Sequence, residues 1–425
     1  MSDWVRIPLD ELVDVIDPHP SHRAPDAVVQ GIPFVGIGDI REDGSLIEGK
    51  GRIVSEKIFD EHIKRYQISD RTIGFGRVAT IGKVISFRNP TTKFVVSPTM
   101  AVLEPKPGTN RDFILHALQS EDIQEQIDKL LTGSTRSSLG IELLRKLTIL
   151  HPASAVAQKI SNVLNSVSNQ IGATQALIDK YTAIKQGMMA DLFSRGIDPE
   201  TKALRPTFEE APELYHETPL GMLPNGWDVK TLGDISEKIT SGSRDWAKFY
   251  SSEGDLFVRI SNLTREHVNF RWDSVKYVDI GGGSEGERTQ LQPGDILVSI
   301  TADLGIVGVV PEDMGRAYIN QHTALIRLST DGENARFIGN YLSSRRGQEQ
   351  FEKNNDSGAK AGINLPTIAS LCCPTPEGKE QILIASKIDA LDEVIADLKR
   401  EKSKNISLKQ GLMQDLLTGQ VSVPA

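Results

Sequence analysis

Hydrophobic and polar residues between positions 153 and 196 alternate with the period of a helix. Apolar or neutral residues recur there at steps of four and three. They are Ile160, Leu164, Val167, Ile171, Thr174, Ile178, Tyr181, Lys185, Met188 and Leu192. A stripe this narrow is typical of a coiled-coil seam. Pro152 precedes it and Gly196 follows it, so the pattern predicts one helix of roughly 65 Å, at about 1.5 Å per residue.

The same design returns at the C-terminal end, in residues 377–425. Lys185–Leu192 reads KQGMMADL, and Lys409–Leu416, 224 positions later, reads KQGLMQDL. The same offset aligns Ile160 with Ile384. Because a long helix with one narrow apolar stripe needs a partner, we expect the two helices to pair with each other.

The repeat also covers the regions that precede the helices. Trp4 aligns with Trp227 and Ile73 with Ile296, each 223 positions apart. The chain is therefore a tandem duplication of a domain followed by a helix. The predicted segments are a first domain at 1–152, a central helix at 153–196, a linker at 197–226, a second domain at 227–376 and a C-terminal helix at 377–425.

Each domain combines short β-rich runs, separated by Gly, Asp, Asn and Pro, with one shorter helix. The shorter helices are expected near residues 111–131 and 335–352. The linker is acidic and contains several prolines, so we expect an extended, solvated connection. The fold class is mixed α and β (α+β), with two globular domains joined by two long helices and a pseudo-two-fold that arises from the duplication.

Composition bounds the class of protein. The 425 residues are 39% hydrophobic and 25% charged, as in globular proteins with sizeable cores. The N-terminus has no basic, apolar leader, and no run of about 18 apolar residues occurs. We therefore expect a cytoplasmic protein without a membrane segment. The adjacent Cys372 and Cys373 are expected to be apolar strand residues rather than part of a metal site or a disulfide framework.

The net charge of −9 argues mildly against a nucleic-acid partner, but charge is unevenly distributed. Between Lys50 and Lys93 there are ten basic and four acidic residues, in a stretch rich in strand formers. A local excess of this kind attracts a phosphate backbone. On charge alone, however, an ordinary solvated basic face is the better explanation of this excess.

Three motifs resemble parts of enzyme sites. Gly74-x-Gly76-x-x-Ala79 resembles a dinucleotide fingerprint, but a β-type sequence follows where a helix is required. Gly82-Lys83 lacks the other residues of a phosphate loop. Asp26, Glu48 and Lys50 have the residue types of a metal-dependent nuclease, although their spacing is loose. We expect no catalytic residue, no metal and no cofactor in this chain.

The segment Glu217–Ile235 resembles the opening of a target-recognition domain in the specificity subunits (HsdS) of type I restriction-modification enzymes. The shared pattern is Gly-x-x-Pro-x-x-Trp, here Gly221, Pro224 and Trp227. The loop Gly133–Leu139 and the KQGxMxDL motif near each helix end also resemble that family. The resemblance covers essentially the whole chain. The first domain departs from the pattern because it begins almost at its tryptophan, without the lead-in.

The resemblance implies a non-catalytic DNA-recognition subunit. Each recognition domain would read one half of a split, asymmetric site in double-stranded DNA. The two long helices would pack as an antiparallel coiled coil that sets the spacer and docks two methyltransferase subunits. Those subunits bind S-adenosylmethionine and methylate adenine. Motor-nuclease subunits, which use ATP and Mg²⁺, would complete the enzyme and provide defence against phage.

Candidate DNA contacts follow from the chemistry of base and phosphate recognition. Arginine can bond guanine bidentately and asparagine can bond adenine, whereas lysine and hydroxyl groups reach phosphates. The candidates in the first half are Lys50, Arg52, Arg77, Lys83, Ser134, Thr135 and Arg136, and those in the second half are Ser243, Arg244, Arg259, Asn262, Lys360 and Asn364.

Three alternatives stay open at this point. The chain could be a non-catalytic DNA-recognition subunit of another defence system. It could be a metal-dependent nuclease that uses Asp26, Glu48 and Lys50. It could also be a structural coiled-coil adaptor without a role on DNA.

Overall fold

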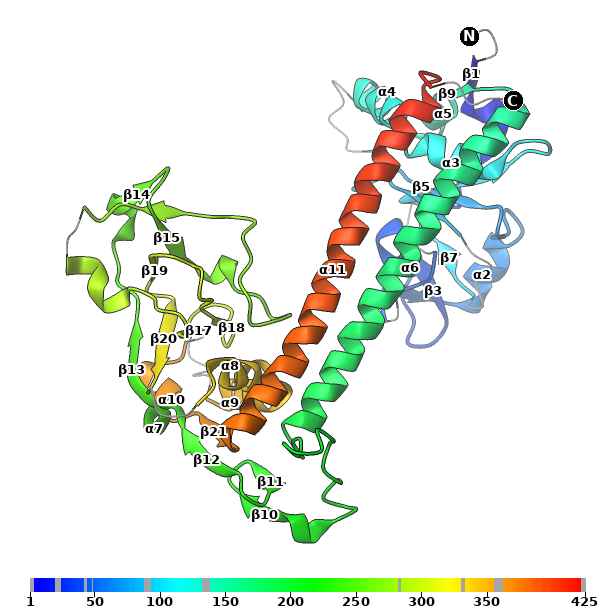
Figure 1. Ribbon diagram of the computed structural model, residues 1–425. Helices are drawn as coiled ribbons and strands as arrows, with labels where there is room; N and C mark the ends of the chain where they lie inside the picture. The colour runs from blue at the N-terminus through cyan, green and yellow to red at the C-terminus, as the bar shows by residue number, and fades with distance from the viewer. Residues whose placement is uncertain are drawn as a thin grey trace. The chain divides into compact units, whose positions relative to one another are not determined.

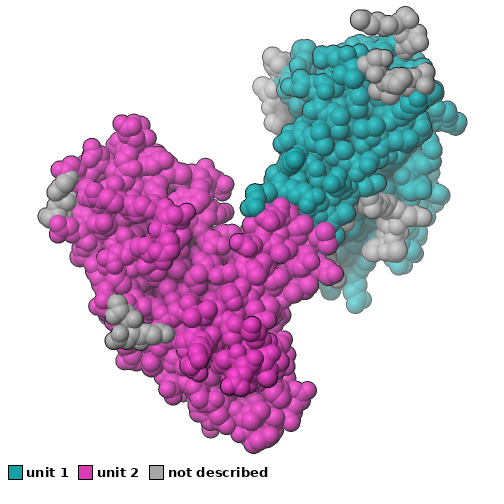
Figure 2. All heavy atoms as spheres, in the orientation of Figure 1, with its two compact units in different colours: residues 1–176, 399–425 teal, residues 177–398 magenta. Residues whose placement is uncertain are grey.

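A computed structural model gives the fold. It describes residues 4–19, 24–41, 44–47, 49–87, 93–131, 138–281, 284–329, 333–354 and 362–421. The chain divides into two compact units (Figure 2). The first unit comprises residues 1–176 and 399–425, and the second comprises residues 177–398. Among the described residues, no helix is both long enough and apolar enough to cross a membrane.

The first unit contains a small α+β domain and parts of both long helices (Figure 1). Its strands are β1 (Val5–Pro8), β2 (Val13–Ile16), β3 (Ile32–Val35), β4 (Arg52–Val54), β5 (Ile73–Gly76), β6 (Val84–Ser86), β7 (Val95–Val96), β8 (Met100–Pro105) and β9 (Thr148–His151). Its shorter helices are α1 (Leu9–Leu12), α2 (Glu56–His62), α3 (Arg111–Leu118), α4 (Glu121–Leu131) and α5 (Ile141–Arg145). The strands form an antiparallel sheet β2-β8-β5-β6, a sheet β4-β3-β7 and the pair β1-β9.

The second unit repeats this plan. Its strands are β10 (Tyr215–Thr218), β11 (Gly221–Pro224), β12 (Asp228–Thr231), β13 (Ser236–Ser241), β14 (Tyr250–Ser251), β15 (Asp255–Val258), β16 (Tyr277–Val278), β17 (Ile296–Ser299), β18 (Val307–Val309), β19 (Ala317–Ile319), β20 (Thr323–Leu328) and β21 (Cys372–Thr375). Its shorter helices are α7 (Leu232–Ile235), α8 (Ala335–Ser343), α9 (Arg345–Lys353) and α10 (Leu365–Ala369). The sheets are β13-β20-β17-β18, β14-β16-β15-β19 and the pair β12-β21.

Strand pairing shows that the two domains have the same fold. In both, one sheet is antiparallel, β2-β8-β5-β6 in the first domain and β13-β20-β17-β18 in the second. The other sheet contains one parallel pair, β3 with β7 or β15 with β19. The strand that carries the two cysteines, β21, pairs with β12 just as β9 pairs with β1. The predicted α+β class and the tandem duplication are confirmed.

Two long helices follow the domains, α6 (Ser154–Leu192) and α11 (Gly378–Leu417). Every residue of the predicted α6 stripe is buried or half-buried. The helices run antiparallel: Gln175 precedes Lys185 along α6, whereas their partners Lys402 and Asp392 come in the opposite order along α11. The predicted coiled coil is confirmed, because Lys185 in the stripe and Gln175 beside it contact α11 directly.

One position of the seam carries a buried ion pair. Lys185 Nζ lies 2.5 Å from Asp392 Oδ1, and both side chains are less than one-tenth exposed. The same ammonium donates to the backbone oxygen of Glu266 at 2.7 Å, which ties α6 to the second domain. Burial raises the pKa of Asp392, and the charge of Lys185 opposes that shift.

The domain cores include residues of both long helices. In the first unit Ile160 and Leu164 of α6 and Leu416 of α11 belong to one apolar cluster with Phe113. In the second unit, Leu192 of α6 and Ile384 of α11 belong to the corresponding cluster. Each domain is therefore held on the helix pair by shared apolar burial.

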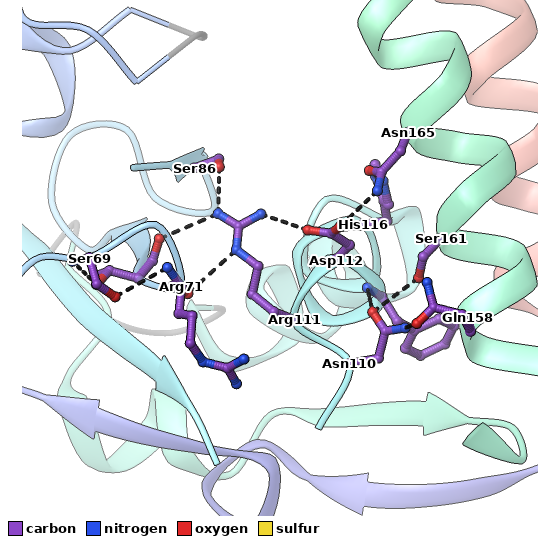
Figure 3. Close-up of polar contacts among 12 residues, drawn as sticks. Ser69, Arg71, Ser86, Asn110, Arg111, Asp112, His116, Gln158, Ser161 and Asn165 are labelled. Atoms are coloured by element: carbon purple, nitrogen blue, oxygen red, sulfur yellow. Dashed lines mark hydrogen bonds and ion pairs between the residues drawn. The ribbon is translucent and has the colours of Figure 1, made fainter. Parts of the chain in front are cut away.

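Polar contacts add to this attachment, and they differ between the units. On α3, Asp112 Oδ2 accepts a hydrogen bond from Asn165 Nδ2 of α6 at 2.7 Å, and His116 Nε2 lies 2.8 Å from Asn165 Oδ1 (Figure 3). The aligned residues in the second unit form an ion pair between Arg336 of α8 and Asp389 of α11, at 2.6 Å. The two domains are therefore attached to the long helices at the same positions, by hydrogen bonds in the first unit and by an ion pair in the second.

His116 makes the stability of the first unit depend on pH. Burial lowers its pKa to about 4, against the opposing effect of the bond to Asn165. The unfolded chain, with a histidine pKa of about 6.5, therefore binds a proton between pH 6.5 and 4 that the folded chain excludes. The difference in pKa is worth roughly 3 kcal/mol in the free energy of unfolding. This contribution is present above pH 6.5 and is lost as the pH falls toward 4.

We therefore expect the melting temperature of the wild type to fall over this range. The fall should be smaller in His116→Asn, because asparagine, the residue at the aligned position 340, does not titrate. Calorimetry at pH 7.5, 6, 5 and 4 checks this. Parallel curves for the two proteins would contradict it.

Two sequence expectations need correction. The single shorter helix of each half is two helices, α3 with α4 and α8 with α9. The break occurs where a serine side chain caps the next helix: Ser344 Oγ accepts from Gly347 N, and Ser120 Oγ accepts from Ile123 N. A serine inside an apolar pattern does not reveal from sequence alone that it is a cap.

The linker is not an extended, solvated connection. It contains the antiparallel hairpin β10-β11, and Leu223 of β11 is fully buried in the second core. The buried carboxylate of Glu380 on α11 anchors it, accepting hydrogen bonds from Ile197 N at 2.8 Å, Arg205 Nη2 at 3.0 Å and Trp227 Nε1 at 3.1 Å. The acids and prolines concealed this, because most of them are exposed; Pro224, which pairs with Tyr215 in the hairpin, is buried.

Candidate nucleic-acid interface

The same strained turn occurs in each domain, after β5 and after β17. Ala79 has φ of 61° and Ala302, 223 positions later, has φ of 60°. Residues other than glycine seldom adopt this left-handed backbone, which costs on the order of 1–3 kcal/mol and is frequent at binding sites. Both alanines are exposed. The strain is thus kept at the same exposed place in both domains.

Backbone hydrogen bonds gather three segments around each turn. In the first domain Arg77 N donates to Thr99 O, and Leu139 N donates to Arg77 O, both at 2.8 Å. In the second domain Ile300 N donates to His322 O, and Ile363 N donates to Ile300 O, both at 3.0 Å. We call these the turn clusters: residues 77–83, 97–99 and 138–139 in the first domain, and residues 300–306, 320–322 and 362–363 in the second.

The two loops proposed from sequence join these clusters. The loop Gly133–Leu139 reaches the first cluster through the bridge between Ser138 and Val78, and the loop before α10 reaches the second through the bridge between Gly362 and Thr301. The candidate residues Ser134, Thr135, Arg136 and Lys360 lie outside the described residues. Their predicted DNA contacts stay predictions.

The second turn cluster contains a chain of hydrogen-bonding side chains. Thr301 Oγ1 lies 2.7 Å from His322 Nδ1, and Gln321 Nε2 lies 3.0 Å from His322 Nε2. Since the amide of Gln321 donates to Nε2, the imidazole proton lies on Nδ1 and is donated to Thr301. These side chains are half-buried, so they are positioned by their neighbours and still reach the surface.

The candidate residues Ser243 and Arg244 lie beside this cluster. Ser243 bridges to Asn320, and its hydroxyl accepts a hydrogen bond from Arg288 Nη2 at 3.2 Å. Arg288, in a short 3₁₀ helix, also donates to Ser241 O at 3.0 Å and so fixes the end of β13. Arg244 is exposed. A cation at the cluster surface suits a phosphate contact.

A family model for the type I restriction modification DNA specificity domain matches this chain twice, at residues 1–182 and 224–408. The chain belongs to this family. The resemblance carried by Glu217–Ile235 is thereby confirmed. Proteins of this family are DNA-recognition subunits rather than enzymes.

Curated relatives and solved structures agree with this assignment. The specificity subunit of the type I restriction enzyme MjaX of Methanocaldococcus jannaschii is 24% identical, over 99% of this chain and 94% of its own. The specificity subunit of EcoBI of Escherichia coli is 21% identical, over 72% and 64%. The crystal structure of the S subunit of a type I system from M. genitalium superposes with a TM-score of 0.57 at 16% identity, covering 97% of this chain and 96% of that one; this similarity shows the fold.

Within this specificity subunit, two candidate residues have structural roles. Arg77 is 7% exposed, its Nε donates to Leu139 O at 3.0 Å, and Asp17 lies 3.6 Å from Nη1. Burial lowers the pKa of Arg77, and the carboxylate of Asp17 opposes this. Asn262 is 2% exposed and bonds Arg271 O and Ser274 O. Both side chains hold loops together and are buried. Their predicted contacts with DNA stay predictions.

The remaining candidates of the specificity subunit lie at or near the surface. Lys83 is half-buried in the first turn cluster and donates to Ile37 O at 3.3 Å. Lys50 and Arg52 are exposed, and Arg52 Nη1 donates to Pro25 O at 2.7 Å. Two further candidates are partly committed to the fold, namely Arg259, which donates to Ser274 Oγ at 2.9 Å, and Asn364, which caps α10. Their contacts with DNA stay predictions.

Two exposed aromatic side chains of the second domain are not among the residues predicted from sequence: Tyr250 on β14, and Trp272 between β15 and β16. Tyr250 is 48% exposed and Trp272 46% exposed. Lys276 Nζ lies 5.9 Å from the centre of the Tyr250 ring, and the Trp272 ring stacks on Phe270. Exposed rings beside cations are typical of nucleic-acid-binding surfaces. Scattered spacing along the chain concealed this set.

The nuclease alternative gains no support from the described residues. Asp26 is exposed, and Glu48 lies outside them. No group of three histidine, cysteine, aspartate or glutamate side chains suited to a metal ion occurs in the described part of the chain. The argument against the nuclease comes from membership of the family, whose proteins are DNA-recognition subunits.

Proposed function

We propose that this specificity subunit directs a type I restriction-modification complex to a bipartite, asymmetric DNA site, and that each turn cluster reads one half of it. The observation that carries the proposal is the pair of clusters, which have the same backbone and different side chains. Asn320, Gln321 and His322 occupy the positions of Ser97, Pro98 and Thr99. A common scaffold with different donors and acceptors is what two different half-sites require.

The other parts have roles consistent with this reading. The antiparallel helices would set the spacer between the half-sites and dock two methyltransferase subunits. In the second unit, Leu177 and Ile184 lie seven residues apart on α6 and are both exposed, so they form an apolar line on one side of the helix. Such a line suits a protein partner. S-adenosylmethionine would be bound by the methyltransferase subunits, and ATP and Mg²⁺ by motor-nuclease subunits.

Reconstitution tests the proposal. The purified chain, incubated with DNA, Mg²⁺ and S-adenosylmethionine, is expected neither to cut nor to methylate, because the site has positioning and readout groups only. Co-expression with the methyltransferase subunits of its host should give adenine methylation of one split sequence. DNA cleavage by the homogeneous chain alone would support the nuclease alternative. Methylation with the same sequence specificity in the absence of the chain would support the adaptor alternative.

A further inference from the structure

A groove with a volume of about 700 Å³ lies in the first unit, between the start of α4, strand β9 and the end of α11. Its apolar part is formed by Ala117, Ile149, Met413 and Leu417. Its polar rim includes Glu121, Asp122 and Glu125, together with several glutamine side chains. We call this the end groove, because the last turn of α11 forms one wall.

The aligned positions in the second unit are filled. Ala117 aligns with Tyr341 and Leu417 aligns with Phe193. Those two rings pack edge to face, with their centres 5.4 Å apart, and both are fully buried. The first unit has smaller side chains at these two positions, whereas Ile123 and Ile149 on other walls are larger than the aligned Gly347 and Cys373. The space that is left is the groove of about 700 Å³, which is open to a guest.

The supporting framework around this space is the same in both units. Gln126 brackets Thr148 by accepting from its backbone nitrogen and donating to its backbone oxygen, both at 2.9 Å. Gln350 brackets Cys372 in the same way, again at 2.9 Å. The end groove is thus a local change of filling within a preserved scaffold, rather than a different arrangement of the helices.

The charge of the groove differs from its counterpart as well. In the second unit Arg346 donates to the backbone oxygen of Phe193, at the C-terminal end of α6, at 3.3 Å. The aligned residue in the first unit is Asp122, which pairs with Arg6 at 2.7 Å. The last turn of α11 contains no basic residue. The described residues that line the groove include three carboxylates and no lysine or arginine.

Helix C-termini and carboxylates attract cations. The second unit shows what this site accepts, because it is filled there by aromatic rings and a guanidinium group. We propose that the end groove binds a segment of a partner protein in which an aromatic residue stands next to an arginine. The ring lies on Met413 and Ala117, and the guanidinium bonds the last carbonyls of α11 and Glu121. The inference rests on the proposed function in one respect, since the partner is sought among the other subunits of the complex.

A peptide titration tests binding without DNA and without enzyme activity. The probe is a twelve-residue glycine-serine peptide with a central Trp-Arg pair, added to the full chain with ¹³C-labelled methionine methyl groups. We expect a saturable shift of the Met413 methyl resonance, assigned through Met413→Leu. The same peptide with Trp-Glu or Ala-Arg should give a much smaller shift, because each lacks one of the two matched groups.

Two variants localise the site. Ala117→Tyr with Leu417→Phe fills the groove as in the second unit and should abolish binding without lowering the melting temperature. Glu121→Arg, which introduces the residue found at the aligned position 345, should weaken binding roughly five- to tenfold. The matched control, Arg345→Glu on the exposed start of α9, should leave binding unchanged.

Several results would overturn the proposal. One is no Met413 shift with the Trp-Arg peptide, and another is equal shifts with all three peptides. A Met413 shift on removing residues 422–425, with no peptide present, would mean that this chain fills its own groove. Concentration-dependent dimerisation abolished by the filled variant would assign the groove to a second copy. Sequence-specific methylation that persists in any of these cases would leave the proposed function standing.

Discussion

Replacing Lys185 with alanine is expected to destabilise the second unit by roughly 3–5 kcal/mol. The change leaves Asp392 as a buried carboxylate without its cation, and removing one member of a buried pair carries a cost of this size. The hydrogen bond to Glu266 O, which ties α6 to the second domain, is lost as well. Urea denaturation followed by tryptophan fluorescence measures the effect in a Trp4→Phe background, which leaves Trp227, Trp246 and Trp272, all in the second unit.

The repeat provides a matched control. Lys409 aligns with Lys185, but it is only half-buried and its nitrogen lies 3.4 Å from the neutral amide oxygen of Gln119. Lys409→Ala is therefore expected to cost less than about 1 kcal/mol. Lys185→Met combined with Asp392→Leu should be less harmful than Lys185→Ala, because no buried charge remains. If both single lysine variants lost the same small amount of unfolding free energy, the buried ion pair would not be more important for stability than the contact of Lys409 with Gln119.

Inserting one heptad into each long helix is expected to lengthen the unspecified spacer of the DNA site by about three base pairs. The insertions are placed between Gln175 and Lys185 and between Asp392 and Lys402. Seven residues preserve the apolar stripe and add roughly 10 Å, at about 1.5 Å per residue and about 3.4 Å per base pair. Both half-site sequences should stay the same, because neither turn cluster is altered.

Sequencing of methylated sites measures this spacer directly. A seven-residue insertion after Lys202, in the exposed part of the linker, is the control and should leave the spacer unchanged. An active complex that keeps the original spacer after the helix insertions would show that the helices do not determine the distance between half-sites.

The long helices and the duplication were predictable from sequence because they depend on local periodicity and on repeated residues. Ile160 and Ile384 occupy the same place in the two stripes, and both are fully buried. The hairpin β10-β11 was not predictable, because the burial of Leu223 depends on a pocket formed by residues far away in the chain. The sequence pattern of one segment does not reveal which distant segments will pack against it.

The candidate site was harder to predict for the same reason. Arg77 is typical of a DNA contact by residue type, yet Asp17 and Leu139, both about 60 residues away, hold it inside the fold. Gln321 and His322 are unremarkable by residue type, yet the fold places them beside a strained turn. The alignment of Ala79 with Ala302 was present in the sequence, but only the backbone shows that both positions are left-handed.

An exchange of residues 227–376 for the aligned domain of a relative that methylates a different sequence tests the central claim most directly. The methylated sites of a host carrying the hybrid chain and its methyltransferase are sequenced beside those of the parent. We expect one half of the split sequence to be replaced, while the other half and the spacer are retained. A change in both halves, or in neither, would contradict it.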